Sequence, residues 1–115
     1  MRKLNLKIIN SLEKIKEKIA SKEALILYFS SKNCVVCSVL KPKIKKEIID
    51  NFTKIALYEI KSDENLDISS YFGVFQAPTI LFYLDGKEFL REGRNISISA
   101  FLNAIKRPYE MFYGE

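Results

Sequence analysis

The stretch "SSKNCVVCSVLKP" (residues 30–42) contains both cysteines of the chain, Cys34 and Cys37, with two residues between them. Directly before it lies "ALILYF" (24–29), a short continuous apolar run of the kind expected of a buried parallel strand. After it, apolar residues recur at helical spacing, which predicts a helix from about 34 to 50. The central feature of the sequence is therefore a strand, a loop, and a C-x-x-C pair where a helix begins.

The remaining segments predict further strands and helices in alternation. "KIALYEI" (54–60) and "TILFYL" (79–84) read as strands, and Asp85-Gly86 is typical of a hairpin turn into an antiparallel strand, "KEFLRE" (87–92). Apolar spacing and capping residues predict further helices at about 8–19, 62–73 and 97–108, the last capped by Ser97 or Ser99 and ended by Pro108.

This order of elements predicts the fold class, an α/β fold. We expect one domain over residues 1–115, with a mixed central sheet of about four strands covered by helices on both faces. The sheet should be mostly parallel, with one antiparallel hairpin at its edge. The tail, residues 108–115, contains four apolar side chains, and we expect them to pack back on the sheet; the alternative is an exposed patch for dimerisation.

Composition and charge exclude several classes of function. The chain is 48% hydrophobic and 29% charged, which fits a globular protein, and it has no apolar run near the ~20 residues of a membrane span. Its net charge is +5, but the lysines alternate with glutamates along predicted helices, so we expect acidic protein partners and no nucleic acid. The basic N-terminus lacks a clean apolar segment, and we expect a cytoplasmic location.

The position of the cysteines predicts different roles for the two sulfurs. Cys34 would lie at a helix N-terminus, where free backbone N–H groups and the helix dipole favour a thiolate. Lys32 lies two residues before it, and no carboxylate occurs within nine residues on either side, so we expect the pKa of Cys34 to be lowered. We therefore predict Cys34 as the attacking thiolate and Cys37, one helical turn further, as the resolving thiol.

Two other interpretations of the cysteine pair are weaker. A metal site would need ligands from a second subunit, because tetrahedral zinc takes four ligands and the chain has two cysteines and no histidine. A purely structural disulfide would close too short a loop to stabilise the chain much, and such bonds rarely persist in a reducing cytoplasm. Because the chain supplies only two of the four ligands that zinc needs, we expect no metal site.

A second motif strengthens the redox interpretation. In "FQAPTILFY" (75–83), Pro78 directly precedes a predicted strand, and a cis Ala77–Pro78 bond there would form a tight turn that can approach the cysteines. With this motif the chain resembles the thioredoxin family from about residue 8 to 106. The matching features are "CVVC" (34–37), Pro42 in the following helix, where we expect a kink, "YFGVFQAPT" (71–79), "LDGK" (84–87) and Gly93.

The resemblance implies an activity as well as a fold. It implies a protein-disulfide oxidoreductase without a bound cofactor, supplied with electrons by an external donor such as a flavin-dependent reductase, and a monomer is favoured over a dimer. Pro78 would be the cis-proline, Ala77 would offer backbone hydrogen bonds to an extended substrate, and Gly93 would flank the same groove.

The chain also departs from the family pattern at three places. Asn33, which would contact the substrate, stands where thioredoxins carry a tryptophan before the first cysteine; Val35-Val36 replaces Gly-Pro, and Tyr28 replaces the buried acid of the first central strand. A redox-inactive binding module that uses the groove around Pro78 is therefore the alternative function.

The missing acid leads to a hypothesis about Glu59. It stands where the family often has the lysine that faces that acid, so carboxylate and partner would be exchanged. A semi-buried Glu59 with a raised pKa would accept the proton of Cys37, and Tyr28 would hydrogen-bond Glu59. The simpler interpretation is that Glu59 points to solvent on an alternating strand.

Overall fold

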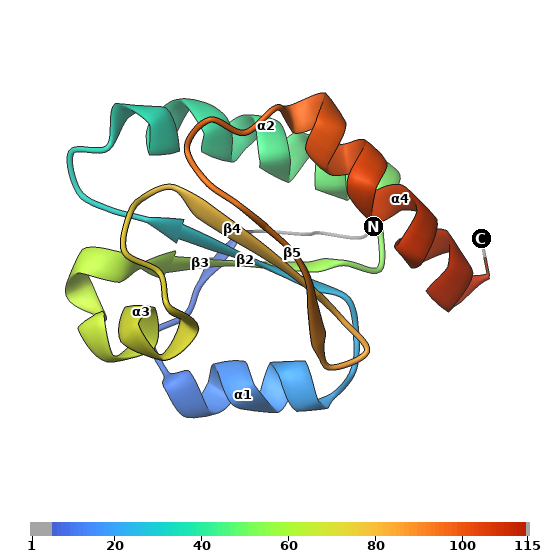
Figure 1. The fold of residues 1–115 in the computed structure, drawn as a ribbon, viewed down its shortest axis with the longest axis horizontal. Helices are drawn as coiled ribbons and strands as arrows, with labels where there is room; N and C mark the ends of the chain where they lie inside the picture. Colours follow the sequence, from blue (N-terminus) through green and yellow to red (C-terminus); the bar gives the residue numbers. More distant parts are fainter. Residues whose placement is uncertain (1–5, 115) are drawn as a thin grey trace.

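Within residues 6–114, five strands form the central sheet, in the order β1-β3-β2-β4-β5 (Figure 1). The strands are β1 (Lys7–Ile8), β2 (Leu25–Ser30), β3 (Ala56–Lys61), β4 (Thr79–Leu84) and β5 (Lys87–Glu92). This computed structural model describes residues 6–114; residues 1–5 and 115 of the predicted domain lie outside the described part. The α/β class with an antiparallel hairpin at one edge is as predicted, while the strand count is five rather than about four.

The directions of the strands differ in part from the prediction. β1 and β2 both pair with β3 in parallel, whereas β4 pairs antiparallel with β2 and with β5. The sheet is therefore evenly divided between parallel and antiparallel pairings. The reason is that the chain enters β4 beside the end of β2, where Thr79 pairs with Phe29, and runs back along that strand.

Helices cover both faces of the sheet, as predicted. α2 (Val35–Asn51) and α4 (Ile98–Tyr113) lie on one face, and α1 (Leu12–Ala20) and α3 (Leu66–Phe72) on the other, with a short 3₁₀ helix, η1 (Ser62–Glu64), before α3 (Figure 1). Pro42 lies inside α2, and Ser97 caps α4 by accepting a hydrogen bond from the Ala100 N–H at 3.3 Å. The two helix layers make two apolar cores, one on each side of the sheet.

The first predicted helix begins later than its apolar spacing suggested. Ile8 belongs to β1 and is 53% exposed, while α1 begins at Leu12. Ser11 sets this boundary, because its Oγ accepts a hydrogen bond from the backbone N–H of Lys14 at 3.2 Å and so caps the helix. Ile8 lies four residues before Leu12, which fits the spacing of a helix, but a single apolar residue at that distance can equally belong to a strand.

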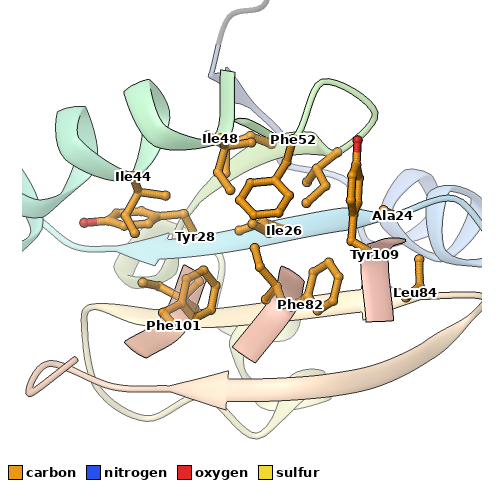
Figure 2. Close-up of a cluster of buried hydrophobic side chains, with 14 of the residues drawn as sticks. Ala24, Ile26, Tyr28, Ile44, Ile48, Phe52, Phe82, Leu84, Phe101 and Tyr109 are labelled. Atoms are coloured by element: carbon orange, nitrogen blue, oxygen red, sulfur yellow. The ribbon is translucent and has the colours of Figure 1, made fainter. Parts of the chain in front are cut away.

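Strand β2 is buried along its whole length and supplies side chains to both cores. Figure 2 shows the core beneath α2 and α4, where Ile26 and Tyr28 of β2 lie with Phe82 of β4 and Phe101 of α4. Because β2 ends at Ser30 and α2 begins at Val35, this core fixes both ends of the short loop that carries Cys34.

The prediction that Pro108 ends the last helix is wrong, because α4 continues to Tyr113. Two tyrosines after the proline attach the last part of α4 to the body of the protein. The Tyr109 hydroxyl accepts a hydrogen bond from the Lys54 backbone N–H at 3.2 Å, and the Tyr113 hydroxyl accepts one from the Ala24 N–H at 3.1 Å. These contacts offset the backbone hydrogen bond that Pro108 cannot make.

The side chains of the tail divide between two environments. Tyr109 is buried and its ring meets that of Phe52 edge-on, with 5.1 Å between the centroids. Met111 and Phe112 are exposed, by 74% and 42%. The tail therefore contributes both packed aromatic rings and apolar surface.

Candidate active site

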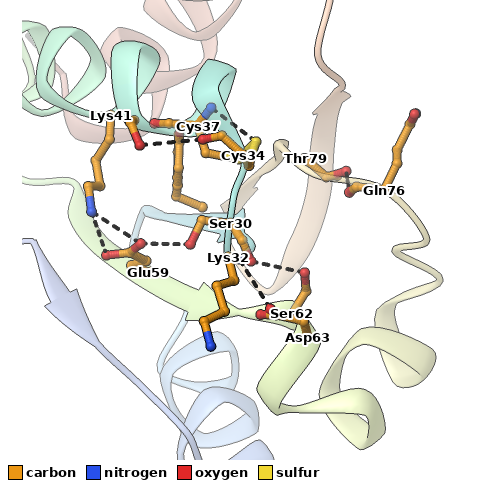
Figure 3. Close-up of a disulfide and its surroundings, with 12 residues drawn as sticks. Ser30, Lys32, Cys34, Cys37, Lys41, Glu59, Ser62, Asp63, Gln76 and Thr79 are labelled. Atoms are coloured by element: carbon orange, nitrogen blue, oxygen red, sulfur yellow. Dashed lines mark hydrogen bonds and ion pairs between the residues drawn. A yellow bond between two sulfur atoms is a disulfide. The ribbon is translucent and has the colours of Figure 1, made fainter.

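The two cysteines form a disulfide at the first turn of α2 (Figure 3). Cys34 is the N-cap residue of the helix, and its Sγ accepts a hydrogen bond from the backbone N–H of Cys37 at 3.1 Å. Asn33, directly before it, has a φ of 63°, a left-handed conformation that asparagine tolerates better than most residues. As predicted, the first cysteine lies where the helix dipole favours negative charge.

The two sulfur-bearing residues differ in their access to solvent. Cys34 is half-buried, whereas Cys37 is only 4% exposed and lies beneath the turn. Val35, between them, is 75% exposed. An incoming disulfide can therefore reach Cys34 far more easily than Cys37.

Tyr28 contacts the cysteine turn in a way that the sequence did not suggest. Its hydroxyl donates a hydrogen bond to the backbone carbonyl of Cys37 at 2.8 Å, so the prediction that Tyr28 hydrogen-bonds Glu59 is wrong. The two residues are in register on β2 and β3, but the tyrosine side chain extends towards the first turn of α2. Burial raises the pKa of Tyr28, and the negative charge of Glu59 raises it further, so the phenol stays neutral.

The contact between Tyr28 and Cys37 should stabilise the fold modestly. Tyr28→Phe should lower the free energy of unfolding at pH 7 by about 1 kcal/mol, the net value of one hydrogen bond. The raised pKa of Tyr28 also predicts an alkaline loss of stability in the wild type, because above pH ~10 the unfolded chain loses its phenolic proton and the folded chain keeps it. Urea unfolding across pH 7–11 would show a shallower alkaline decline for Tyr28→Phe; an identical decline would contradict this assignment.

Glu59 is buried beside the disulfide, so the interpretation that it points to solvent is wrong. Its side chain is 5% exposed, and two partners hold it. The Ser30 hydroxyl donates to Oε2 at 2.7 Å, and the Lys41 ammonium lies 3.3 Å from both carboxylate oxygens (Figure 3). The lysine compensates the buried negative charge.

A small polar pocket joins these groups to Cys37. It has a volume of about 260 Å³, and its lining residues are Ser30, Ser31, Lys32, Cys37, Ser38, Lys41, Glu59, Lys61 and Glu64. Sequence reasoning missed Ser30 and Lys41, because their role at the site depends on contacts with Glu59, which is far from both along the chain. It also considered only charges near Cys34 along the chain; in the folded protein, Glu59 and Glu64 lie at the same pocket as Cys37.

Lys32 lies on the loop before the cysteines, with its side chain exposed. Its backbone N–H donates a hydrogen bond to the Asp63 carboxylate at 3.1 Å, which joins the loop to η1. The folded protein therefore brings a carboxylate to the backbone of the loop that carries Lys32 and Cys34.

The second motif reaches the same end of the sheet. The Ala77–Pro78 bond is cis, and Pro78 immediately precedes Thr79, which pairs with Phe29 at the end of β2. Pro78 is buried and Ala77 is half-buried. The Thr79 hydroxyl donates to the backbone carbonyl of Gln76 at 2.7 Å and so stabilises the turn (Figure 3).

Two shallow pockets flank this proline turn. Ala77 and Ser31 line one of them, of about 320 Å³, together with Phe75, whose side chain is 87% exposed. Gly93 lines the other, of about 370 Å³, and a Cβ built on it would lie 3.5 Å from the side-chain nitrogen of Gln76. Exposed apolar surface thus lies next to the loop that leads to Cys34.

Within residues 6–114, no helix combines the length and apolar character needed to cross a membrane. Over the same residues, no three or more His, Cys, Asp and Glu side chains gather so that they could hold a metal ion.

A disulfide that opens a helix, next to a prolyl turn at the adjoining strand, supports thiol–disulfide oxidoreductases as the general class. The family model described as Thioredoxin matches residues 7–106. The chain belongs to the thioredoxin family.

Individual relatives agree with this placement. The thioredoxin-like protein YdfQ of Bacillus subtilis is 32% identical over 107 residues, which cover 93% of this chain and 95% of that protein. A thioredoxin of Borreliella burgdorferi is 37% identical over 82 residues, covering 70% of this chain and 69% of that one. The crystal structure of thioredoxin from Trypanosoma brucei brucei, 20% identical, superposes with a TM-score of 0.80 over 91% of both chains.

Proposed function

We propose that this protein exchanges the Cys34–Cys37 dithiol or disulfide with disulfides of other proteins, with Cys34 as the nucleophile and Cys37 as the resolving thiol. The observation that carries the proposal is the unequal exposure of the pair: Cys34 is half-buried at the start of α2, and Cys37 is 4% exposed beneath it. Only the outer sulfur can meet a large partner first. The inner sulfur can then reach the outer one without leaving the protein.

In the reducing direction the reaction has two steps. The Cys34 thiolate attacks one sulfur of the substrate disulfide, forms a mixed disulfide, and releases the other substrate sulfur as a thiolate. Cys37 then loses its proton and attacks Cys34 Sγ, which closes the Cys34–Cys37 disulfide and releases the second substrate thiolate. Two electrons have passed from the protein to the substrate. The Cys37 N–H and the α2 dipole stabilise the Cys34 thiolate.

The surroundings of the proline turn suit an extended segment of a substrate protein. Ala77 lies two residues before Thr79, which pairs with Phe29 at the end of β2, and Gly93 lines the neighbouring pocket. Asn33, directly before Cys34, and Phe75, in the pocket that Ser31 and Ala77 line, are both exposed and would contact the substrate. The net charge of +5 favours acidic partners. Electrons would come from an external donor such as a flavin-dependent reductase in the cytoplasm, with no bound cofactor.

Glu59 is our candidate for the proton acceptor of Cys37. Both residues line the same pocket, and among the carboxylates that line it, Glu59 is buried while Glu64 is exposed. Lys41 holds both carboxylate oxygens at 3.3 Å and keeps the group in place. The carboxylate would thus lie on β3, with Ser30 and Lys41 as its partners in place of the predicted Tyr28.

Glu59→Gln tests this role, since it keeps the size of the side chain and removes its basicity. Resolution of the mixed disulfide at pH 7 should slow by about 10²-fold, the lower end of general acid–base contributions. The formation of the mixed disulfide should change little, because it uses the Cys34 thiolate. Quenched-flow separation of the two steps by mass spectrometry measures both rates. An unchanged resolution rate across pH 6–9 would remove Glu59 from the mechanism.

Insulin reduction with a dithiol donor separates the proposed enzyme from the binding-module alternative. The enzyme should accelerate precipitation of the insulin B chain above the rate of the dithiol alone, and in proportion to protein concentration. A binding module should give the background rate. Removal of both cysteines provides the matched control, because the groove around Pro78 is then unchanged.

A further inference from the structure

We propose that the Ser30 hydroxyl relays the proton between Cys37 and the Glu59 carboxylate. This inference rests on the proposed function and deepens it, because it assigns a residue to the resolving step. The Ser30 hydroxyl can accept a hydrogen bond from the Cys37 thiol with a lone pair while it donates its own hydrogen to Glu59.

The position of Ser30 carries the proposal. It is the last residue of β2, is 6% exposed, and donates to Glu59 Oε2 at 2.7 Å. Ser30, Cys37 and Glu59 line one pocket of about 260 Å³. Figure 3 shows Ser30 between Glu59 and the turn that carries the cysteines. The serine therefore occupies the route from the resolving sulfur to the buried carboxylate.

The other groups around the pocket are less suited to receive the proton. The Tyr28 hydroxyl donates to the Cys37 carbonyl, and the phenol is a neutral, weak base. Three lysines line the pocket from the loop, α2 and β3, and as cations they cannot accept a proton: Lys32, Lys41 and Lys61. Glu64 lines it from η1 but is exposed, and Asp63 of η1 accepts a hydrogen bond from the Lys32 backbone.

The relay conserves protons and electrons. As Cys37 attacks Cys34 Sγ, the thiol proton passes to Ser30 Oγ while the original hydroxyl hydrogen passes to Glu59 Oε2. The serine is unchanged at the end, Glu59 is protonated, and the departing substrate thiolate carries the electron pair of the broken S–S bond. Glu59 then returns its proton to water or to the thiolate, and the reverse reaction follows the same path.

A chromogenic aryl disulfide, 5,5′-dithiobis(2-nitrobenzoate), makes the two steps visible in the full-length reduced protein. At one equivalent, Cys34 releases the first coloured thiolate at a rate that depends on reagent concentration. Cys37 releases the second in a step that does not. This leaving group departs as an anion at pH 7, so the proton that moves in the second step is the one on Cys37.

Ser30→Ala should slow the second release at pH 7 by at least about tenfold and leave the first within about twofold. The deficit should shrink as the pH rises, because hydroxide in solution increasingly removes the thiol proton without the relay. Ser30→Thr, which retains a hydroxyl, should recover most of the rate. Should Ser30→Ala fail to fold, Ser30→Gly provides a second variant without the hydroxyl.

Two further variants separate a relay from a structural role. Ser62→Ala is the matched control: it removes a hydroxyl that donates to the Ser30 backbone carbonyl at 3.0 Å rather than to the Glu59 carboxylate, so both releases should be unaffected. The double variant Ser30→Ala/Glu59→Gln should be no slower than Glu59→Gln alone, since both changes interrupt one path. An unchanged second release in Ser30→Ala, or additive losses in the double variant, overturns the relay. A wild-type protein that gives no second release refutes the proposed function instead.

Discussion

Replacing Cys34 by serine should abolish disulfide exchange, with a fall in insulin reduction of about 10³-fold or more, to the uncatalysed background. A serine hydroxyl is not ionised at neutral pH, so the helix N-terminus has no thiolate to stabilise. Of the two sulfurs, only that of Cys34, which is half-buried at the start of α2, can meet a large disulfide directly. Cys37, at 4% exposure, cannot substitute for it.

Cys37→Ser is the matched variant and should fail differently. Cys34 remains reactive, so the first release of coloured thiolate should persist, but the mixed disulfide should accumulate because no resolving thiol follows. Intact-mass spectrometry after incubation with substrate should find the adduct on Cys37→Ser and none on Cys34→Ser. If Cys37→Ser supported turnover while Cys34→Ser gave the stable adduct, the roles of the two sulfurs would have to be exchanged.

The sequence was most informative where chemistry depends on neighbours along the chain. Cys34 and Cys37 are three residues apart, and a strand before them and helical spacing after them were enough to place the pair at a helix N-terminus. Pro78 before a strand was likewise a local signal. The prediction of the charges around Cys34 was incomplete, because it considered only residues near Cys34 along the chain, whereas Asp63 comes from η1.

The groups that complete the site have no local signature. Ser30 and Glu59 are 29 residues apart, and Lys41 and Glu59 are 18 apart, so neither contact could be read from spacing. Sequence reasoning selected Glu59 only through a family alignment, and it then assigned the wrong partner, Tyr28. Which neighbour a buried carboxylate finds depends on where α2 crosses the end of the sheet.

Pro108 shows the opposite case, in which a strong local signal was overridden. A proline inside a helix removes one backbone hydrogen bond, which usually ends the helix or kinks it. Here the helix continues, because Tyr109 and Tyr113 on the far side make hydrogen bonds to backbone N–H groups distant in the chain. Tertiary packing of two aromatic rings outweighed the local preference.

Phe82→Ala should be the most destabilising of the substitutions considered, lowering the free energy of unfolding by about 3–5 kcal/mol. Phe82 is fully buried on β4, next to Ile26 of β2, in the core beneath α2 and α4 (Figure 2). Its removal leaves a cavity that the surrounding side chains can only partly fill. Because small domains are stable by only about 5–15 kcal/mol, this loss is a large fraction of the total.

Phe75→Ala makes the matched comparison, since the same atoms are removed from a side chain that is 87% exposed. Its unfolding free energy should stay within about 0.5 kcal/mol of the wild type. Urea unfolding of the oxidised proteins, followed by circular dichroism, keeps the disulfide constant in all three. Equal losses in the two variants would mean that the loop before Pro78 packs against the protein in solution, and Phe75 would then be unable to offer apolar surface to a substrate next to Cys34.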